Sequence, residues 1–170
     1  GLEAADQKMI DDVARHVAIL QAPNMSLVVN VLLRIVGSVA ALLGEQYDIE
    51  ISETHHRYKK DAPSGTALAL ARQICDATGK DYGRAVVFDR HGDDCPRQQG
   101  EISMHALRLG DNTGEHTVSF GGEGEGLELR HFSTSRDSYV LGAIKAASFI
   151  ANQPPGRYTM ADVLGIGNEK

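Results

Sequence analysis

Chemically reactive side chains are concentrated between residues 53 and 66, which read Glu-Thr-His-His-Arg-Tyr-Lys-Lys-Asp-Ala-Pro-Ser-Gly-Thr. Two histidines, an arginine and two lysines fall within residues 55–60, in a chain whose formal net charge is −6. Histidine titrates near neutrality, and a lysine ammonium is a compact proton donor. His55 and Lys59 are therefore candidates for moving a proton.

A helix start follows the basic residues directly. Residues 61–63 form a turn, and Ser64, Gly65 and Thr66 have the composition of a helix N-terminus. Backbone N–H groups point outward there, and the helix dipole favours negative charge. Together with His56, this helix start can hold a carboxylate. The alternative is a solvated basic turn before an ordinary serine cap, since charge runs usually lie on the surface.

The residues on either side predict the elements that position this stretch. Apolar and polar residues alternate from 47 to 54, which is typical of a half-buried strand. Consecutive strand side chains point to opposite faces, so His55 and His56 should have different roles if the strand continues that far. Residues 64–78 predict a helix that ends at Gly79.

The remaining patterns predict a mixed α+β (α/β) fold. Further helices are expected at residues 3–16, 26–43, 136–152 and 159–164, and further strands at residues 17–20, 102–106, 118–120 and 127–129. The short links at 110–114 and 121–126 predict that the last three strands are antiparallel neighbours. We expect a mixed four-stranded sheet, covered on one face by the helices at 26–43 and 64–78.

The order of elements at the start of the chain resembles the tail of a parallel, doubly wound sheet. Ligands of such sheets bind outside the carboxyl ends of the strands, where residues 22–25 lie; the alternative is a capped turn. We expect residues 1–24 to end a doubly wound (Rossmann-type) domain and residues 25–135 to form a second domain. Residues 136–170 should be a helix and tail that pack back toward the first.

Composition narrows the class of partners. A pI near 5.6 argues against nucleic acid. The apolar run at 26–43 is interrupted by Asn30, Arg34 and Ser38 on one helix face, so a buried amphipathic helix is favoured over a membrane span. Two cysteines form no Cys-x-x-Cys pair, and residues 1–16 lack a secretory apolar segment, so we expect a cytoplasmic protein.

Three further histidines lie on the expected strands. His105, His116 and His131 can meet on one sheet face, but no histidine–carboxylate spacing of the zinc type accompanies them. We therefore expect ordinary sheet or interface histidines, His116 serving loop structure, and no metal. The outer sheet face should carry polar residues: Ser103, His105, Thr117, Ser119, Glu128 and Arg130.

Residues 53–67 also resemble the signature of the dihydrodipicolinate reductase family. That pattern is Glu-x-His-His-Arg-x-Lys-x-Asp-Ala-Pro-Ser-Gly-Thr-Ala, and every fixed position is met here. The resemblance extends to residues 110–111, 114–117 and 133–136. It implies NADPH- or NADH-dependent reduction of 4-hydroxy-tetrahydrodipicolinate to tetrahydrodipicolinate, in diaminopimelate and lysine biosynthesis. It also implies a homotetramer.

The resemblance implies roles for individual residues. His55 and Lys59 would be catalytic: His55 as proton donor or acceptor, and Lys59 as proton donor. His56, Ser64, Gly65, Thr66 and Arg136 would bind the small dicarboxylate substrate, and Ala22, Pro23, Asn24 and Met25 would contact the cofactor. The family's glycine-rich nucleotide-binding part does not match any residues here, so we expect negligible turnover from residues 1–170 alone. The alternative is a non-catalytic binding or assembly module that keeps the signature.

Overall fold

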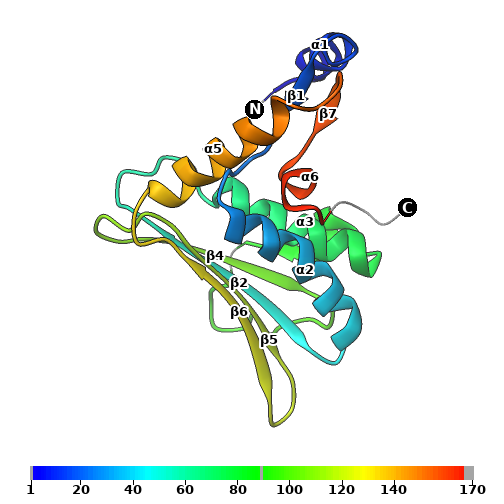
Figure 1. The fold of residues 1–170 in the computed structure, drawn as a ribbon. Helices are drawn as coiled ribbons and strands as arrows, with labels where there is room; N and C mark the ends of the chain where they lie inside the picture. Colours follow the sequence, from blue (N-terminus) through cyan, green and yellow to red (C-terminus); the bar gives the residue numbers. More distant parts are fainter. Residues whose placement is uncertain (1, 89, 167–170) are drawn as a thin grey trace. The chain divides into compact units, whose positions relative to one another are not determined.

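The computed structural model describes residues 2–88 and 90–166, which divide into two compact units (Figure 1). One unit spans residues 31–136; the other combines the described parts of residues 1–30 and 137–170. The elements are α1 (Ala4–Ala14), β1 (Ala18–Leu20), α2 (Leu27–Leu43), β2 (Asp48–His55), α3 (Gly65–Thr78), α4 (Tyr82–Ala85), β3 (Val86–Val87), β4 (Ile102–Arg108), β5 (Glu115–Gly121), β6 (Gly126–Phe132), α5 (Asp137–Ile150), β7 (Gly156–Tyr158) and α6 (Met160–Leu164).

The 31–136 unit contains a mixed sheet in the order β3-β4-β2-β5-β6. The mixed α and β class is confirmed, but the sheet has five strands rather than four, because the two-residue β3 adds to the edge of β4. Strand β2 is central: it is parallel to β4 and antiparallel to β5. The site-bearing strand is therefore hydrogen-bonded on both sides.

The predicted pairing of the 102–108 and 115–121 strands is wrong. Strand β2 lies between β4 and β5, and only β5 and β6 form a hairpin of sequence neighbours. The link after β4 crosses the end of β2: the Leu109 N–H donates to the His55 carbonyl at 2.8 Å, and the Arg57 N–H donates to the Gly110 carbonyl at 3.1 Å. A short link therefore spans one strand width instead of closing a hairpin.

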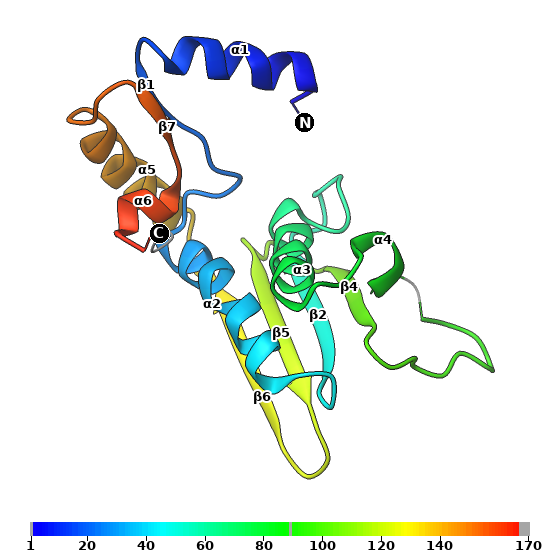
Figure 2. The same cartoon turned by 90° about the vertical axis from the view of Figure 1, so that its right-hand side faces the viewer.

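One face of this sheet packs against α2 and α3 (Figure 2). The strands contribute alternating apolar residues that are fully or almost fully buried: Ile49, Ile51, Ile102, Met104, Val118 and Phe120. The helices contribute residues at helical spacing: Leu32, Val36 and Ala40 from α2, and Leu70, Ala71 and Ile74 from α3. This core fixes which residues of β2 point inward.

The open face carries the predicted polar residues, but one of them is not exposed. Ser103 is buried rather than exposed, because the side chains of Arg90 and Arg97 fold over it. Arg97 also bonds Ile49 O and Glu50, so the segment after β3 is tied across the start of β2. The rest of this face is half-buried or exposed.

The second unit has its own small core. Strands β1 and β7 pair in parallel, and Ala146, Met160 and Val163 pack with Leu20 and Phe149. Gly142 of α5 lies against the Met25 carbonyl so closely that an added Cβ would sit 1.8 Å from that oxygen. The loop that follows β1 is therefore held by close contact with α5.

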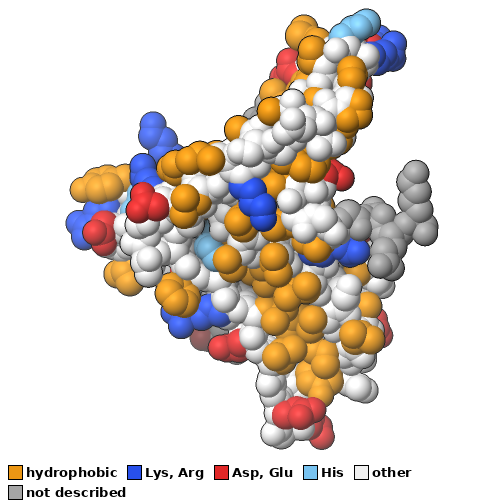
Figure 3. All heavy atoms as spheres, viewed as in Figure 1, with side chains coloured by type: hydrophobic (Ala, Val, Ile, Leu, Met, Phe, Trp, Pro, Cys, Tyr) orange, Lys and Arg blue, Asp and Glu red, His pale blue; other side chains and the backbone are white. Residues whose placement is uncertain are grey.

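The outer side of α2 is partly apolar. Val31, Ile35 and Leu42 are exposed, and Figure 3 shows hydrophobic atoms gathered in the region of this helix. Even so, none of the helices within residues 2–88 and 90–166 is both long and apolar enough to span a bilayer.

Candidate functional site

The helix-facing side of β2 changes from apolar to polar along its length. Ile49 and Ile51 belong to the core, whereas Glu53 and His55, next on the same side, enter a polar cluster. Strand pairing brings His116 opposite Glu53 and Arg108 opposite His55. The sheet register therefore gathers four polar side chains at the carboxyl end of β2.

Glu53 is at the centre of this cluster and is only 1% exposed. Arg108 donates to both carboxylate oxygens, from Nη1 to Oε2 and from Nη2 to Oε1, each at 2.9 Å. His55 Nδ1 lies 2.6 Å from Oε2, and the Ser64 N–H donates to Oε1 at 3.0 Å. The buried charge is thus paired and both oxygens are satisfied, as a buried carboxylate requires.

These contacts set the protonation of the pair. Burial alone would raise the pKa of Glu53, but the hydrogen bonds from Arg108, His55 and Ser64 outweigh it and hold that pKa below its usual range. Burial lowers the pKa of His55; the contact with Glu53 opposes this, and the charges of Lys59 and Arg108 add to it. Near pH 7 the arrangement is an ionised carboxylate beside a neutral imidazole.

A second histidine supports the helix start. His116 is 1% exposed, and its Nε2 lies 3.0 Å from Ser64 Oγ, which also accepts the Ala67 N–H at 3.2 Å. Its ring meets that of His55 edge-on at 5.2 Å and that of His131 at 5.8 Å. Burial lowers the pKa of His116 to about 3, so this ring is neutral. His116 is thus part of the cluster, not of loop structure.

Lys59 lies beside this cluster rather than inside it. Its ammonium pairs with Asp61 at 2.9 Å, and that hydrogen bond lowers the pKa of Asp61. The Lys59 side chain is 20% exposed, and its charge acts on His55. His56 follows the end of β2, half-buried, with its ring 6.4 Å from that of Tyr58. The two adjacent histidines have different surroundings.

The start of α3 is a serine-capped helix N-terminus, where the helix dipole favours negative charge. Ser64 is the N-cap, with extended backbone angles, and its Oγ accepts a hydrogen bond from the Ala67 N–H of the first turn. Gly65 is exposed, whereas Ser64 and Thr66 are buried. The Asp61 carbonyl accepts from Arg108 Nη2 at 2.7 Å, so the preceding turn is tied to the same arginine that holds Glu53.

The other predicted site residues lie elsewhere in the chain. Arg136 is exposed, directly before α5. Residues 22–25 belong to the second unit, in the loop after the carboxyl end of β1. There, Asn24 Oδ1 accepts the Ser26 N–H at 2.8 Å, and the Asn24 carbonyl accepts from Asn30 Nδ2 at 2.9 Å. This loop has a defined, hydrogen-bonded shape.

The three strand histidines do not form one group. His116 and His131 pair on the helix-facing side, but His105 pairs with Ser52 in the register and lies on the open face, with Nε2 2.6 Å from Glu50. Within residues 2–88 and 90–166, no set of three or more histidine, cysteine or acidic side chains has an arrangement that could hold a metal ion.

Sequence reasoning did not identify Glu53, Arg108 and His116 as parts of the site. A signal for Glu53 was present, because the alternation from Ile49 puts this carboxylate on the buried side, where it needs a partner. Arg108 and His116 become visible only once β2 is known to lie between β4 and β5.

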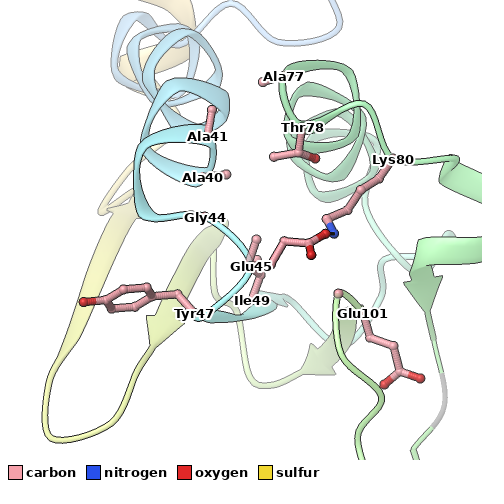
Figure 4. A pocket seen from close by; sticks show the side chains of 11 residues that line it. Ala40, Ala41, Gly44, Glu45, Tyr47, Ile49, Ala77, Thr78, Lys80 and Glu101 are labelled. Atoms are coloured by element: carbon pink, nitrogen blue, oxygen red, sulfur yellow. Dashed lines mark hydrogen bonds and ion pairs between the residues drawn. The ribbon is translucent and has the colours of Figure 1, made fainter.

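A cavity of about 300 Å³ lies elsewhere in the same unit, where the ends of α2 and α3 meet residues 100–101 (Figure 4). Ala40 and Ile49 are among the residues that line it. Lys80 Nζ lies 3.0 Å from Glu45 Oε1 beside it. None of the predicted site residues lines this cavity, and its lysine already has a carboxylate partner, so we do not take it as the site.

Comparison with known proteins gives one consistent result. The model of the family described as "Dihydrodipicolinate reductase, C-terminus" matches residues 28–164. The protein called 4-hydroxy-tetrahydrodipicolinate reductase from Syntrophus aciditrophicus (strain SB) is 47% identical over 166 residues, covering 98% of this chain and 62% of the relative. The protein of the same name from Anaeromyxobacter sp. (strain Fw109-5) is 50% identical over 153 residues, covering 90% of this chain and 57% of the relative.

A solved structure shares the fold. It is described as dipicolinate-bound dihydrodipicolinate reductase from Paenisporosarcina sp. TG-14, and it superimposes with a TM-score of 0.67 at 23% identity, covering 95% of this chain and 61% of that one. The chain therefore spans about three fifths of the length of the relatives it matches.

Proposed function

Because the chain belongs to the dihydrodipicolinate reductase C-terminus family, we propose that it is the substrate-binding and proton-transfer part of a 4-hydroxy-tetrahydrodipicolinate reductase. The enzyme would reduce its substrate with NADPH or NADH to tetrahydrodipicolinate, in diaminopimelate and lysine biosynthesis. The observation that supports this best is the Glu53–His55 pair joined through Ser64 to a helix N-terminus, with Lys59 alongside.

The reaction requires a held dicarboxylate and a proton delivered near it. His56, Ser64, Gly65 and Thr66 would hold the substrate carboxylates, since the α3 N-terminus favours anions. Lys59 would donate the proton to the substrate, and His55 would accept or donate one. Arg136 would contribute a further positive charge. Dipicolinate, named in the description of the structural neighbour, has the dicarboxylate chemistry that such a cradle suits.

The chain's fit to a nicotinamide cofactor is limited to one loop. Residues 22–25 follow the carboxyl end of a parallel strand and are held by Gly142 and Asn30, which suits the nicotinamide end of a dinucleotide. When bound, that group supplies the hydride. Ala22, Pro23, Asn24 and Met25 would orient it, while the pyrophosphate site would lie in a glycine-rich part outside residues 1–170.

The functional assembly would be a cytoplasmic homotetramer. The open face of the sheet lies opposite the face that packs against α2 and α3 (Figure 2), and it carries exposed charges of both signs, such as Glu128 and Arg130. Uncovered sheet edges favour pairing with another chain, and a face with charges of both signs can complement a second copy of itself. Closed symmetry of four such chains would cover these faces.

A chimera tests the proposed activity. Residues 1–170 would replace the matching part of the Syntrophus aciditrophicus reductase, which is similar over 98% of this chain. We expect turnover with NADPH or NADH and 4-hydroxy-tetrahydrodipicolinate, and negligible turnover from residues 1–170 alone. A folded chimera that binds dipicolinate but does not turn over would instead support a non-catalytic binding module.

A further inference from the structure

Glu53 is a buried carboxylate that neither donates nor accepts the reacting proton in the proposed function. It nevertheless contacts two groups that do the proposed work. Its Oε2 lies 2.6 Å from His55 Nδ1, and its Oε1 accepts the Ser64 N–H at 3.0 Å. One side chain therefore links the proton-transfer histidine with the helix start that would bind substrate.

The two hydrogen bonds from the Arg108 guanidinium determine the ionisation of the Glu53 carboxylate. Two parallel N–H bonds at 2.9 Å keep the carboxylate ionised, and an ionised carboxylate can only accept hydrogen bonds. His55 Nδ1 must therefore carry a hydrogen to make its contact. In the neutral ring, Nε2 is then the atom with a free lone pair.

The burial of His55 indicates which ring nitrogen faces away from Glu53. The side chain is 12% exposed, and Nδ1 is turned toward a carboxylate that is wholly buried. Nε2 is thus the ring nitrogen left to meet a substrate. Arg108 holds the Asp61 carbonyl, and Glu53 holds the Ser64 N–H. The His55 ring and the start of α3 are therefore positioned by the same Glu53–Arg108 pair.

We propose that Glu53 is the positioning residue of this site. It fixes His55 as the Nδ1–H tautomer, with Nε2 facing the substrate. It also holds the α3 N-terminus at a fixed distance from the His55 ring. The catalytic consequence rests on the proposed function, whereas the tautomer does not. Glu53 and Arg108 thus act on the chemistry of His55 as well as on the stability of the fold.

The first test reads the tautomer directly in residues 1–170. Long-range ¹H–¹⁵N correlation spectra of ¹⁵N-histidine-labelled protein at pH 7.5 separate the two neutral forms, and His55→Gln assigns the His55 signals. We expect the Nδ1–H pattern for His55. An Nε2–H pattern in the unaltered chain overturns the proposal without any Glu53 variant.

Glu53→Gln should invert this pattern. Its single oxygen would serve Ser64 and Arg108, and its amide would donate to His55 Nδ1, which moves the ring hydrogen to Nε2. His105, paired with Glu50 on the other sheet face, is the internal reference and should not change. If the Gln variant does not fold, Glu53→Asp can be used instead. It keeps the negative charge but places the carboxylate farther from His55, so it should give a mixture of tautomers. An unchanged His55 pattern in a folded variant contradicts the proposal.

The second test uses the chimera and separates positioning from binding. Glu53→Gln should lower kcat roughly 10–10²-fold, less than the 10²–10⁴-fold expected for losing a proton-transfer group, with KM within about threefold. Glu53→Asp should recover part of kcat. Glu45→Gln, at the other end of the unit, is the matched control and should leave kcat unchanged. Equal kcat in Glu53→Gln and the parent would overturn the catalytic part, whereas an inactive parent chimera would count against the proposed function alone.

Discussion

Lys59 and Lys60 are adjacent lysines with different surroundings. Lys59 pairs with Asp61 and acts on the pKa of His55, whereas Lys60 is exposed. In the chimera, Lys59→Ala should lower kcat by roughly 10²–10⁴, the span of a lost proton donor, with a smaller change in KM. Lys60→Ala is the control and should leave both near the parent values. Steady-state kinetics would contradict the assignment if the two variants behaved alike.

His116 makes stability depend on pH. Its pKa is about 3 when folded and about 6.5 when unfolded, so below pH 6.5 the unfolded chain binds a proton that the folded chain does not. This contribution to stability is full above pH 6.5 and falls as the pH drops toward 3, by up to about 1.4 kcal/mol per pH unit. The lowered pKa values of His55 and His131 act in the same direction.

Urea unfolding of residues 1–170 at pH 7.5 and 5.5 measures this dependence. His116→Gln should reduce the difference in unfolding free energy between the two pH values, because one depressed histidine is removed. His16→Gln, at an exposed position, should keep the parent difference. A His116 variant with the full pH dependence would show that this ring is not the source.

At this scale, the sequence motif predicted His55, Lys59 and Ser64 as site residues but not the buried partners Glu53, Arg108 and His116. His55, Lys59 and Ser64 are neighbours in the sequence, so one motif brings them together. Arg108 reaches Glu53 from 55 residues away, and His116 reaches Ser64 from 52 residues away. Such pairs depend on which strands are neighbours, which local patterns do not report.

Among the elements, helices were predicted more reliably than strand neighbours. Helix α3 (Gly65–Thr78) is capped by Ser64 and Gly79, close to the predicted bounds, because a serine cap and a left-handed glycine (φ 68°) have local causes. The order of β4, β2 and β5 has no local cause. A short link such as residues 109–114 fits both a hairpin and a crossing of one strand. The sheet has the second arrangement, in which Ile51 lies between Met104 and Val118.

Helix α5 and the loop after β1 meet at a glycine. Gly142→Ala would place a Cβ 1.8 Å from the Met25 carbonyl, so helix or loop must move. We expect a loss of about 1–3 kcal/mol of stability. In the chimera we also expect weaker binding of NADPH or NADH, because residues 22–25 are displaced. Thermal unfolding and nucleotide titration measure the two effects.

Ala143→Ser is the matched control on the same helix. This position is exposed, so stability and nucleotide affinity should stay near the parent values. Unchanged affinity in a destabilised Gly142→Ala variant would separate the loop from cofactor binding and leave only its packing role.

For the whole molecule, the open sheet face predicts assembly. Light scattering at low micromolar concentration should give about four times the 18.3 kDa chain mass. Leu107→Asp, on the open face, should shift the population to smaller species, since it places a charge among the strands that would meet. Leu42→Asp, on the outer side of α2, should not. A parent chain that stays monomeric on concentration would contradict the tetramer.

The central position of β2 determines where the chain can change length. Side chains alternate along a strand, so one added residue between Ile51 and Glu53 would turn Glu53 and His55 to the opposite face. Pairing with both β4 and β5 prevents the rest of the strand from shifting its register to compensate. Residues 91–94 are exposed and lie outside the sheet, so an insertion there leaves that register intact. Across a library of single-residue insertions, functional chimeras should be absent within 49–55 and frequent at 91–94.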